Sequence, residues 1–390
     1  MSQTHTRRWR IAVAVGVAVA TAVAPLGAPP GQAAQLAPSQ LVGFTIGADG
    51  RLYPATTGPS SGPSGPVSNA VIAPPGAGVS AVRQPDGNLA TFVIGTQGAL
   101  VAGTTNSASS GFRIFTDGAG GLAPPGGQVS AVSTADGVHA FFVGNDGALY
   151  GASYVQRVQP GAGPQRISAT GIAPPGAVVA ATRQGNVPGA LFVGADGGLQ
   201  SVWRTGTNTW ATVPASPPGL APPGGGVAAT SGAVVYAFLT GLDGRLWRVN
   251  FAAGGLPDPW DPVAISGVGA APVGARLAAA QFTTGQLSVF FAGADGAIRV
   301  ATNLAGGWIE PAVASQPGIA RPGGPISLTV VDDYVYVAWC GNNIWWWFFW
   351  WWRRPIPPPP GPPPWSGEVF SFPTSNPVRV GFDTSITMIR

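Results

Sequence analysis

The chain repeats one short pattern that predicts a strand, a tight turn and a second strand. In the copy at 141–150, FFVGNDGALY, an apolar run leads into the turn residues Asn145-Asp146-Gly147. Glycine tolerates the positive φ that tight hairpins require. The further copies are FTIGADGRLY at 44–53, FVIGTQGALV at 92–101, LFVGADGGLQ at 191–200, FLTGLDGRLW at 238–247, FFAGADGAIR at 290–299 and the diverged AWCGNNIWW at 338–346. Successive copies lie about 49 residues apart, which predicts one body built from repeats.

A second motif, rich in proline and glycine, recurs between these hairpins. Its copies are IAPPG at 72–76, LAPPG at 122–126, IAPPG at 172–176, LAPPG at 220–224, AAPVG at 270–274 and IARPG at 319–323. Each copy precedes a run of small and apolar residues, such as VSAV at 129–132. Since proline cannot sit in a central strand, the motif predicts a loop that ends where the first strand of a unit begins.

Each unit therefore reads as four strands, which is the size of a propeller blade. The inner strands are apolar or small with little alternation, as expected where neighbouring blades cover both faces. No segment keeps a helical period, so a helical solenoid is excluded. We predict an all-β fold, a seven-bladed β-propeller of four-stranded antiparallel blades occupying residues 35–390. The first hairpin lacks a preceding small-residue strand, so we expect residues 377–390 to pair with it and close the ring.

The N-terminal 34 residues have the pattern of a secretory signal. Arg7, Arg8 and Arg10 precede the apolar run 11–24, and Pro25 ends it. Small residues near Ala33 would suit a signal peptidase. We therefore expect a secreted, extracellular or envelope protein, with an uncleaved membrane anchor as the alternative.

Composition excludes several classes of function. Removing the three leader arginines from the 19 basic residues leaves 16, against 15 acidic residues, so we expect no nucleic-acid partner. Cys340 is the single cysteine, which rules out an intramolecular disulfide, and its apolar context predicts burial. Each hairpin turn carries at most one aspartate, too few for a calcium loop. We expect no metal, no cofactor and no catalytic residues; a degenerate glycoside hydrolase is the weakest alternative, because there is no lysine and His139 is the sole histidine beyond the leader.

Aromatic residues are the best candidates for a binding role. Tyr53, Tyr150 and Trp247 directly follow the leucine of their hairpins, and Trp203 lies four residues after Leu199. Rings at a strand edge can stack on the apolar face of a sugar. Packing between blades is the alternative; the pattern favours it over binding, and most strongly for the aromatics of the last strands, which are Trp210, Trp260 and Trp308.

The last unit contains an insertion at 345–365, with WWWFFWWW followed by two arginines and the proline-rich IPPPPGPPPW. One interpretation is a local clamp in which a polyproline arm covers the aromatic strand. A second is a patch that contacts a membrane or envelope polymer, because tryptophan favours that boundary. A third is a poorly ordered insertion. The candidate contact residues are Trp345, Trp346, Trp347, Trp350, Trp351 and Trp352.

The hairpin repeat, with PWDPVAIS at 259–266, resembles the tachylectin-type and bacterial fucose-binding lectin-like β-propellers, and sialidases share the architecture more distantly. The resemblance implies a propeller with shallow carbohydrate sites near or between blades. This chain departs from the pattern at Val101, Gln200 and Arg299, where the aromatic is replaced. We expect lectin-like recognition of envelope or host glycans, with a structural or protein-binding scaffold as the alternative.

Overall fold

The computed structural model describes residues 42–56, 65–106, 109–155, 157–161, 163–252, 262–304, 307–331, 334–340, 347–352, 367–371 and 387–389. The described residues all belong to one compact unit, Ala33–Arg390. The predicted signal segment 1–34 lies outside the described residues, as does most of the insertion 345–365. The described part of the chain contains no helix long and apolar enough to span a membrane.

All regular elements among the described residues are β-strands, grouped in seven sheets. The first sheet contains β1 (Val42–Ile46), β2 (Leu52–Thr56) and β27 (Thr387–Ile389). The second contains β3 (Val79–Arg83), β4 (Leu89–Ile94), β5 (Leu100–Asn106) and β6 (Ser109–Asp117). The third contains β7 (Val129–Thr134), β8 (Gly137–Val143), β9 (Leu149–Val155) and β10 (Gln165–Arg166). The fourth sheet contains β11 (Val179–Gln184), β12 (Val187–Val193), β13 (Leu199–Gly206) and β14 (Thr209–Pro214). The fifth contains β15 (Val227–Ala229), β16 (Val235–Thr240), β17 (Leu246–Phe251) and β18 (Val263–Ala264). The sixth sheet contains β19 (Leu277–Gln281), β20 (Leu287–Ala292), β21 (Ile298–Leu304) and β22 (Gly307–Val313). The seventh contains β23 (Ile326–Val331), β24 (Tyr334–Cys340), β25 (Trp347–Trp352) and β26 (Gly367–Ser371).

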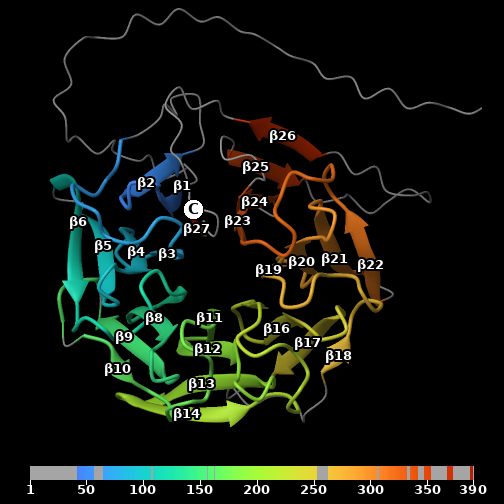
Figure 1. The fold of residues 1–390 in the computed structure, drawn as a ribbon, viewed down its shortest axis with the longest axis horizontal. Coiled ribbons are helices and arrows are strands. Elements are labelled where there is room, and N and C mark those ends of the chain that lie inside the picture. The colour runs from blue at the N-terminus through green and yellow to red at the C-terminus, as the bar shows by residue number, and fades with distance from the viewer. Residues whose placement is uncertain are drawn as a thin grey trace, which may run out of the picture. The chain divides into compact units, whose positions relative to one another are not determined.

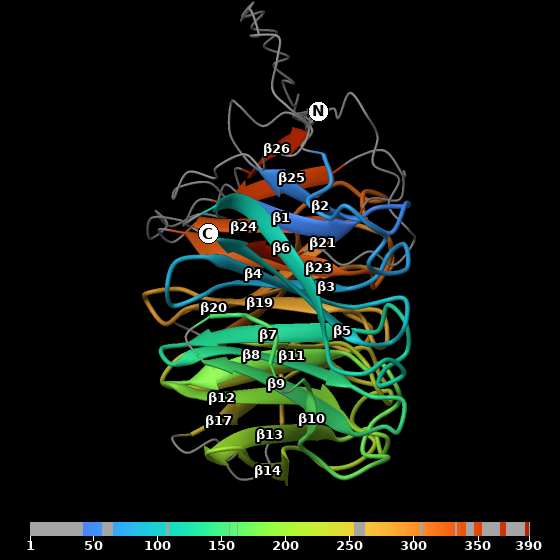
Figure 2. The same cartoon turned by 90° about the vertical axis from the view of Figure 1, so that its left-hand side faces the viewer.

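Six of the sheets contain four antiparallel strands that are neighbours in chain order. Their first strands lie toward a common centre and their last strands toward the periphery, and successive sheets stack face to face (Figure 1, Figure 2). Each first strand contacts the first strand of the next sheet, from β3 through β7, β11, β15 and β19 to β23. This is the arrangement of a β-propeller, and the prediction of an all-β propeller is confirmed.

The first sheet differs from the four-stranded prediction, because three strands are described in it. The C-terminal strand β27 pairs antiparallel with β1, with Phe44 opposite Thr387. β27 also contacts β3 and β23, the first strands of the neighbouring sheets. The expected pairing of the C-terminal segment with the first unit is therefore present, and it removes an open edge from β1.

Local turn chemistry explains why the hairpins form where they do. Gly147 has a φ of 71°, and its N–H donates to the carbonyl of Gly144 at 3.0 Å. Asp146 Oδ1 accepts the N–H of Ala148 at 3.0 Å, as an aspartate does in an Asx turn. Aspartates 49, 196, 243 and 295 make the equivalent bond. The aspartates thus serve the turns, and the described residues contain no group of three or more His, Cys, Asp or Glu that could hold a metal.

The proline-glycine motif joins consecutive sheets. The N–H of Ala123 donates to Gly98 in the hairpin of the second sheet at 3.0 Å. The carbonyl of the preceding Leu122 accepts the N–H of Asn145, in the hairpin of the third sheet, at 2.8 Å. Hydrogen bonds in the same pattern recur around Ile72, Ile172 and Leu220. The motif recurs because each copy satisfies the backbone of two adjacent hairpins.

The hydrophobic core is divided among the interfaces between sheets. Each of the six buried clusters combines residues from two consecutive sheets. Five successive interfaces each hold one aromatic pair with ring centroids 5.5 to 5.8 Å apart. The pairs are Phe44–Phe112, Phe92–Tyr154, Phe141–Trp210, Trp203–Phe251 and Phe238–Trp308. Trp210 and Trp308 therefore pack between blades, as predicted.

Candidate functional site

Two of the predicted aromatic residues lie over a hairpin turn and bond to its aspartate. The Tyr53 hydroxyl donates to Asp49 Oδ2 at 2.8 Å. The Tyr150 hydroxyl donates to Asp146 Oδ2 at 3.2 Å. Burial, followed by the bond to the neighbouring aspartate, raises the pKa of both tyrosines. Each ring is half-buried, so one part packs on the blade while another part stays accessible.

The glycine that begins each hairpin makes room for the side chain after the leucine. A Cβ on Gly144 would clash with the ring of Tyr150, and one on Gly241 would clash with Trp247. Tyr150 also stacks on Phe142, with ring centroids 5.6 Å apart and planes 8° from parallel. These contacts fix the ring orientation before any ligand arrives, which lowers the entropy cost of binding.

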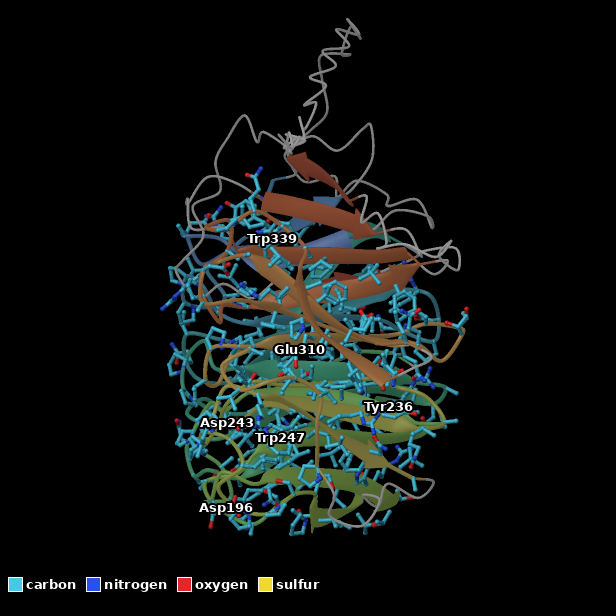
Figure 3. The ribbon with its side chains drawn as sticks, turned by 90° about the vertical axis from the view of Figure 1, so that its right-hand side faces the viewer. Asp196, Tyr236, Asp243, Trp247, Glu310 and Trp339 are labelled. Carbon is cyan, nitrogen blue, oxygen red and sulfur yellow. The ribbon has the colours of Figure 1, made fainter. Side chains whose placement is uncertain are left out.

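Trp247 lies at the hairpin edge of the fifth sheet, near Asp243 (Figure 3). Asp243 Oδ2 lies 3.4 Å from Arg245 Nε in an exposed ion pair. A half-buried ring beside a carboxylate and a guanidinium provides a stacking surface together with hydrogen-bond acceptors and donors. The equivalent positions without an aromatic are Val101, which is 7% exposed, Gln200, and Arg299, which bonds Asp295 Oδ2 at 3.0 Å.

Trp203 does not share this environment. It is 4% exposed, and its ring packs against Phe251 of the fifth sheet at a centroid distance of 5.8 Å. A Cβ on Gly189 would clash with the same ring. Trp203 is a core residue with no exposed face for a sugar, so we leave it out of the proposed site.

A polar cluster that the sequence pattern did not indicate lies between the fifth and sixth sheets. On β17, Arg248 and Asn250 stand opposite Phe238 and Tyr236 of β16, so all four share one face. Phe238 packs against Trp308 of the sixth sheet, and this contact identifies the face that meets β22. The neighbouring β17 residues, including Val249, pack against the fourth sheet instead.

Three polar atoms in this cluster are buried without a hydrogen-bond partner among the described residues, namely Arg248 Nε, Asn250 Oδ1 and Trp308 Nε1. Glu310 follows Trp308 by two residues on β22 and is exposed, and its Oε1 lies 3.5 Å from where a Cβ on Gly267, in the loop after β18, would stand. Tyr236 and Glu310 lie on the side of the propeller shown in Figure 3. Unpaired buried polar atoms are costly and each needs an explanation, and a ligand that satisfies several of them at one interface is the explanation proposed below.

Between the third and fourth sheets, charged residues form a closed network. Arg204 Nη2 lies 2.9 Å from Asp136 Oδ2, and the Thr134 hydroxyl donates to Asp136 Oδ1 at 2.6 Å. The bond from Thr134, assisted by Arg204, lowers the pKa of Asp136 to about 2. His139 is 3% exposed, and burial, followed by the charge of Arg204, lowers its pKa to about 4. These groups satisfy one another, which is the pattern of a structural network.

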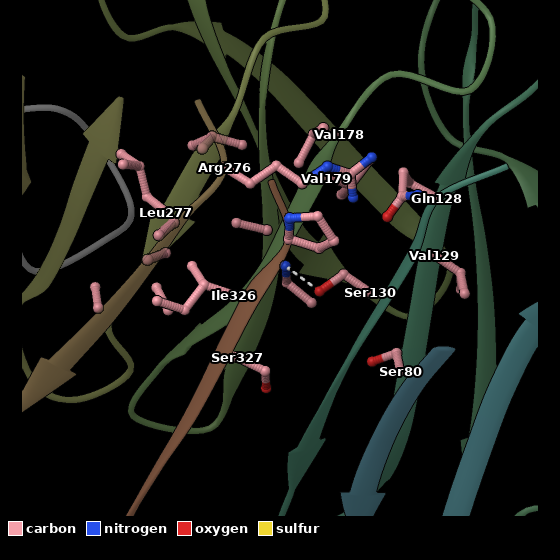
Figure 4. A pocket seen from close by; sticks show the side chains of 18 of the residues that line it. Ser80, Gln128, Val129, Ser130, Val178, Val179, Arg276, Leu277, Ile326 and Ser327 are labelled. Carbon is pink, nitrogen blue, oxygen red and sulfur yellow. Dashed lines mark hydrogen bonds between the residues drawn. The ribbon is translucent and has the colours of Figure 1, made fainter. Parts of the chain in front are cut away.

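A central pocket of about 280 Å³ is lined by the first strands of six sheets (Figure 4). The Ser80 hydroxyl accepts the N–H of Ala131 at 2.9 Å, and Ser130 accepts the N–H of Ala181 at 3.0 Å. Each serine thus bridges to the next sheet. The small residues of the first strands suit this crowded centre.

The segment of the predicted envelope contact, 345–365, lies largely outside the described residues. Trp345 and Trp346 lie outside the described residues. Trp347, Trp350, Trp351 and Trp352 belong to β25, which pairs with β24. Cys340 is the last residue of β24. Contact with a membrane or envelope polymer stays a prediction, as does any structure around Trp260.

No protein-family model matches the chain, and no curated protein does. Among solved structures, the BP39L lectin from Burkholderia pseudomallei is similar, with a TM-score of 0.74 and 28% identity over 80% of this chain and 92% of that chain. AofleA from Arthrobotrys oligospora has a TM-score of 0.54 and 14% identity over 80% of this chain and 89% of that chain. A lectin of Aleuria aurantia, solved with Fucα1-6GlcNAc, has a TM-score of 0.51 and 13% identity over 77% of this chain and 97% of that chain.

The chain is thus a β-propeller similar in structure to lectins, which bind carbohydrates. These similarities agree with the prediction that the chain is not an enzyme. They do not single out the tachylectin-type family, so that finer resemblance stays a prediction.

Proposed function

We propose that this chain is a secreted, non-catalytic protein that recognises glycans through sites between and at the edges of its blades. The structural likeness to BP39L lectin supports carbohydrate binding by this fold. The leader-like segment 1–34 supports secretion or attachment at the envelope. The pairing of β27 with β1, and its contacts to β3 and β23, support a closed ring of seven blades.

The observation that carries the proposal is the cluster between the fifth and sixth sheets. Trp308 offers an indole N–H, Asn250 an acceptor oxygen and Arg248 a guanidinium, and the three named atoms are buried without partners among the described residues. Sugars present alternating hydroxyls that both donate and accept, so they match this set.

The turns that carry Tyr53, Tyr150 and Trp247 are proposed as additional shallow sites. Each combines a half-buried ring with an aspartate in the same hairpin. Repeated weak sites raise the overall affinity for a glycan-covered surface through effective concentration. Fucosides are the first ligands to test, because the Aleuria aurantia lectin was solved with Fucα1-6GlcNAc.

The test is a glycan-array screen of residues 35–390 that includes fucosides and bacterial envelope polysaccharides. Variants Arg248→Ala, Tyr150→Ala and Trp247→Ala are screened beside it, with Arg183→Ala as the control, since Arg183 lies in the fourth sheet and bonds the carbonyl of Gly185. Selective binding that weakens in the site variants and persists in the control supports the proposal. Absence of binding by protein shown to be folded would favour the scaffold alternative instead.

A further inference from the structure

A second pocket, of about 300 Å³, lies between the second and third sheets. It is distinct from the sites proposed above, and none of the turns that carry Tyr53, Tyr150 and Trp247 contributes to it. The loop between β3 and β4 supplies Asp86, β6 supplies Arg113 and Phe115, and the segment after β9 supplies Arg157 and Gln159. Its volume is at the lower end of the range for small-ligand sites, which suits one sugar residue.

A buried glutamine holds the two walls of this pocket together. Gln84 is 3% exposed, and its Oε1 accepts the N–H of Val158, from the third sheet, at 2.6 Å. Its Nε2 donates to Thr104 Oγ1 at 2.7 Å and to the carbonyl of Leu89 at 3.3 Å. Because these bonds join both sheets, the spacing of the walls is set before a ligand binds.

The charge of the pocket is unbalanced. Neither Arg113 nor Arg157 takes part in an ion pair within the part of the chain that the structure describes. Arg157 Nε donates to Gln159 Oε1 at 3.3 Å. Asp86, the one acidic residue lining the pocket, accepts the backbone N–H of Asn88 at 3.0 Å and its side-chain amide at 2.8 Å. Two guanidinium groups and a single carboxylate, which already accepts hydrogen bonds, therefore line the pocket.

From this geometry we infer that the pocket between the second and third sheets binds an anionic sugar, one that carries a carboxylate or a sulfate. A guanidinium pairs with either anion through parallel hydrogen bonds. Asp86 accepts from sugar hydroxyls, and the partly buried Phe115 covers the apolar side of the ring. The site is therefore separate from the cluster of Arg248, Asn250 and Trp308.

The test is isothermal titration of residues 35–390 with methyl β-glucuronide, glucose 6-sulfate, methyl β-glucoside and inorganic sulfate. We expect at least one of the two anionic sugars to bind about tenfold more tightly than the neutral glucoside, because one charge-assisted contact distinguishes them. The preferred anionic sugar identifies the charged group. Added salt should weaken its binding, since the guanidinium groups are exposed.

Variants Arg113→Gln and Arg157→Gln are expected to lose this preference while they still bind neutral glycans. Arg183→Gln, which removes an exposed arginine of the fourth sheet, is the matched control and should behave as the unaltered protein. Equal affinity for glucuronide, glucose 6-sulfate and glucoside would overturn the inference. So would inorganic sulfate binding as tightly as the anionic sugars, or unchanged binding in both variants. Neutral-glycan binding is scored separately, so failure of this site and failure of the proposed function are distinguishable.

Discussion

The Tyr150 hydroxyl donates a hydrogen bond to Asp146 Oδ2 at 3.2 Å, while Oδ1 of the same carboxylate accepts the N–H of Ala148 at 3.0 Å. One aspartate therefore closes the hairpin turn and positions the ring that follows it. Tyr53 and Asp49 repeat this relationship in the first sheet. A turn residue selected for backbone geometry is thereby also placed where a sugar hydroxyl could reach it.

Tyr150→Ala and Tyr150→Phe should separate the roles of ring and hydroxyl. The phenylalanine keeps the stack on Phe142 and loses only the bond to Asp146, so we expect a change in affinity below about threefold. The alanine removes the stacking surface, and we expect about tenfold weaker binding at this turn, from roughly 1.4 kcal/mol of lost contact. Titration with a glycan identified on the array measures both. Equal affinity in Tyr150→Ala and the unaltered protein would rule out this turn as a site.

Trp308→Phe tests the cluster between the fifth and sixth sheets. Trp308 Nε1 is buried without a partner among the described residues, and a phenylalanine keeps the ring contact with Phe238. Removing the indole N–H should therefore change the free energy of unfolding by less than about 1 kcal/mol. Glycan affinity should fall about fivefold, because the indole N–H is removed. Trp210→Phe, at the equivalent contact with Phe141, is the control and should leave binding intact. Equal loss in both variants would argue against a site at Trp308.

His139 should make stability depend on pH. Burial lowers its folded-state pKa from 6.5 to about 4, so the folded protein favours the neutral imidazole. The contribution of neutral His139 to the free energy of unfolding is fully present above pH 6.5. It is lost as the pH falls toward 4, by about 3 kcal/mol in total. Denaturant unfolding of residues 35–390 between pH 7.5 and 4.5 measures it, since His139 is the one histidine in that range.

His139→Gln should flatten this pH profile. The pKa of Asp136 is lowered to about 2, so protonation of Asp136 affects stability only below pH 4. That range lies outside the interval from pH 7.5 to 4.5 that is measured. A profile that stays equally steep in the variant would mean that other groups cause the acid sensitivity.

Gly98→Ala and Gly121→Ala compare two glycines with positive φ, of 70° and 79°. An added Cβ at Gly121 meets nothing within 4 Å, so we expect a cost of about 1 kcal/mol from the backbone alone. At Gly98 the Cβ would also clash with the carbonyl of Ala123, in the proline-glycine motif that joins two hairpins, so we expect a cost of about 3 kcal/mol. Thermal or denaturant unfolding measures both, and equal costs would refute the role given to this contact.

Ending the chain at residue 386 removes β27 and exposes the edge of β1. We expect a lower melting temperature and concentration-dependent self-association, because an unpaired edge is a template for another strand. Removal of Arg390 alone, which lies beyond β27, is the control. Calorimetry and light scattering measure the two effects. If the shortened protein were as stable and as monomeric as the full chain, the pairing would have no role in closure.

The sequence determined the features that depend on local chemistry or on the repeat. Asp146 and Gly147 mark a hairpin by themselves, because turn geometry involves only adjacent residues. The repeat then predicted sheets stacked side by side, and the unpaired first hairpin predicted the partner of β1. Only the tertiary structure decided which aromatics are accessible. Trp203 and Trp247 look alike as tryptophans near the leucine of a hairpin, yet strand alternation and the neighbouring sheet bury the first at the Phe251 contact.

The cluster of Arg248, Asn250 and Trp308 illustrates the same limit more strongly. These residues come from β17 and β22, in two different repeats, and no local spacing relates them. They meet because two sheets pack face to face, and the pairing of Phe238 with Trp308 sets which faces meet. The pocket between Arg113 and Arg157 arises in the same way. Turns are decided within a few residues, whereas binding sites between blades are decided by side chains that only packing brings together.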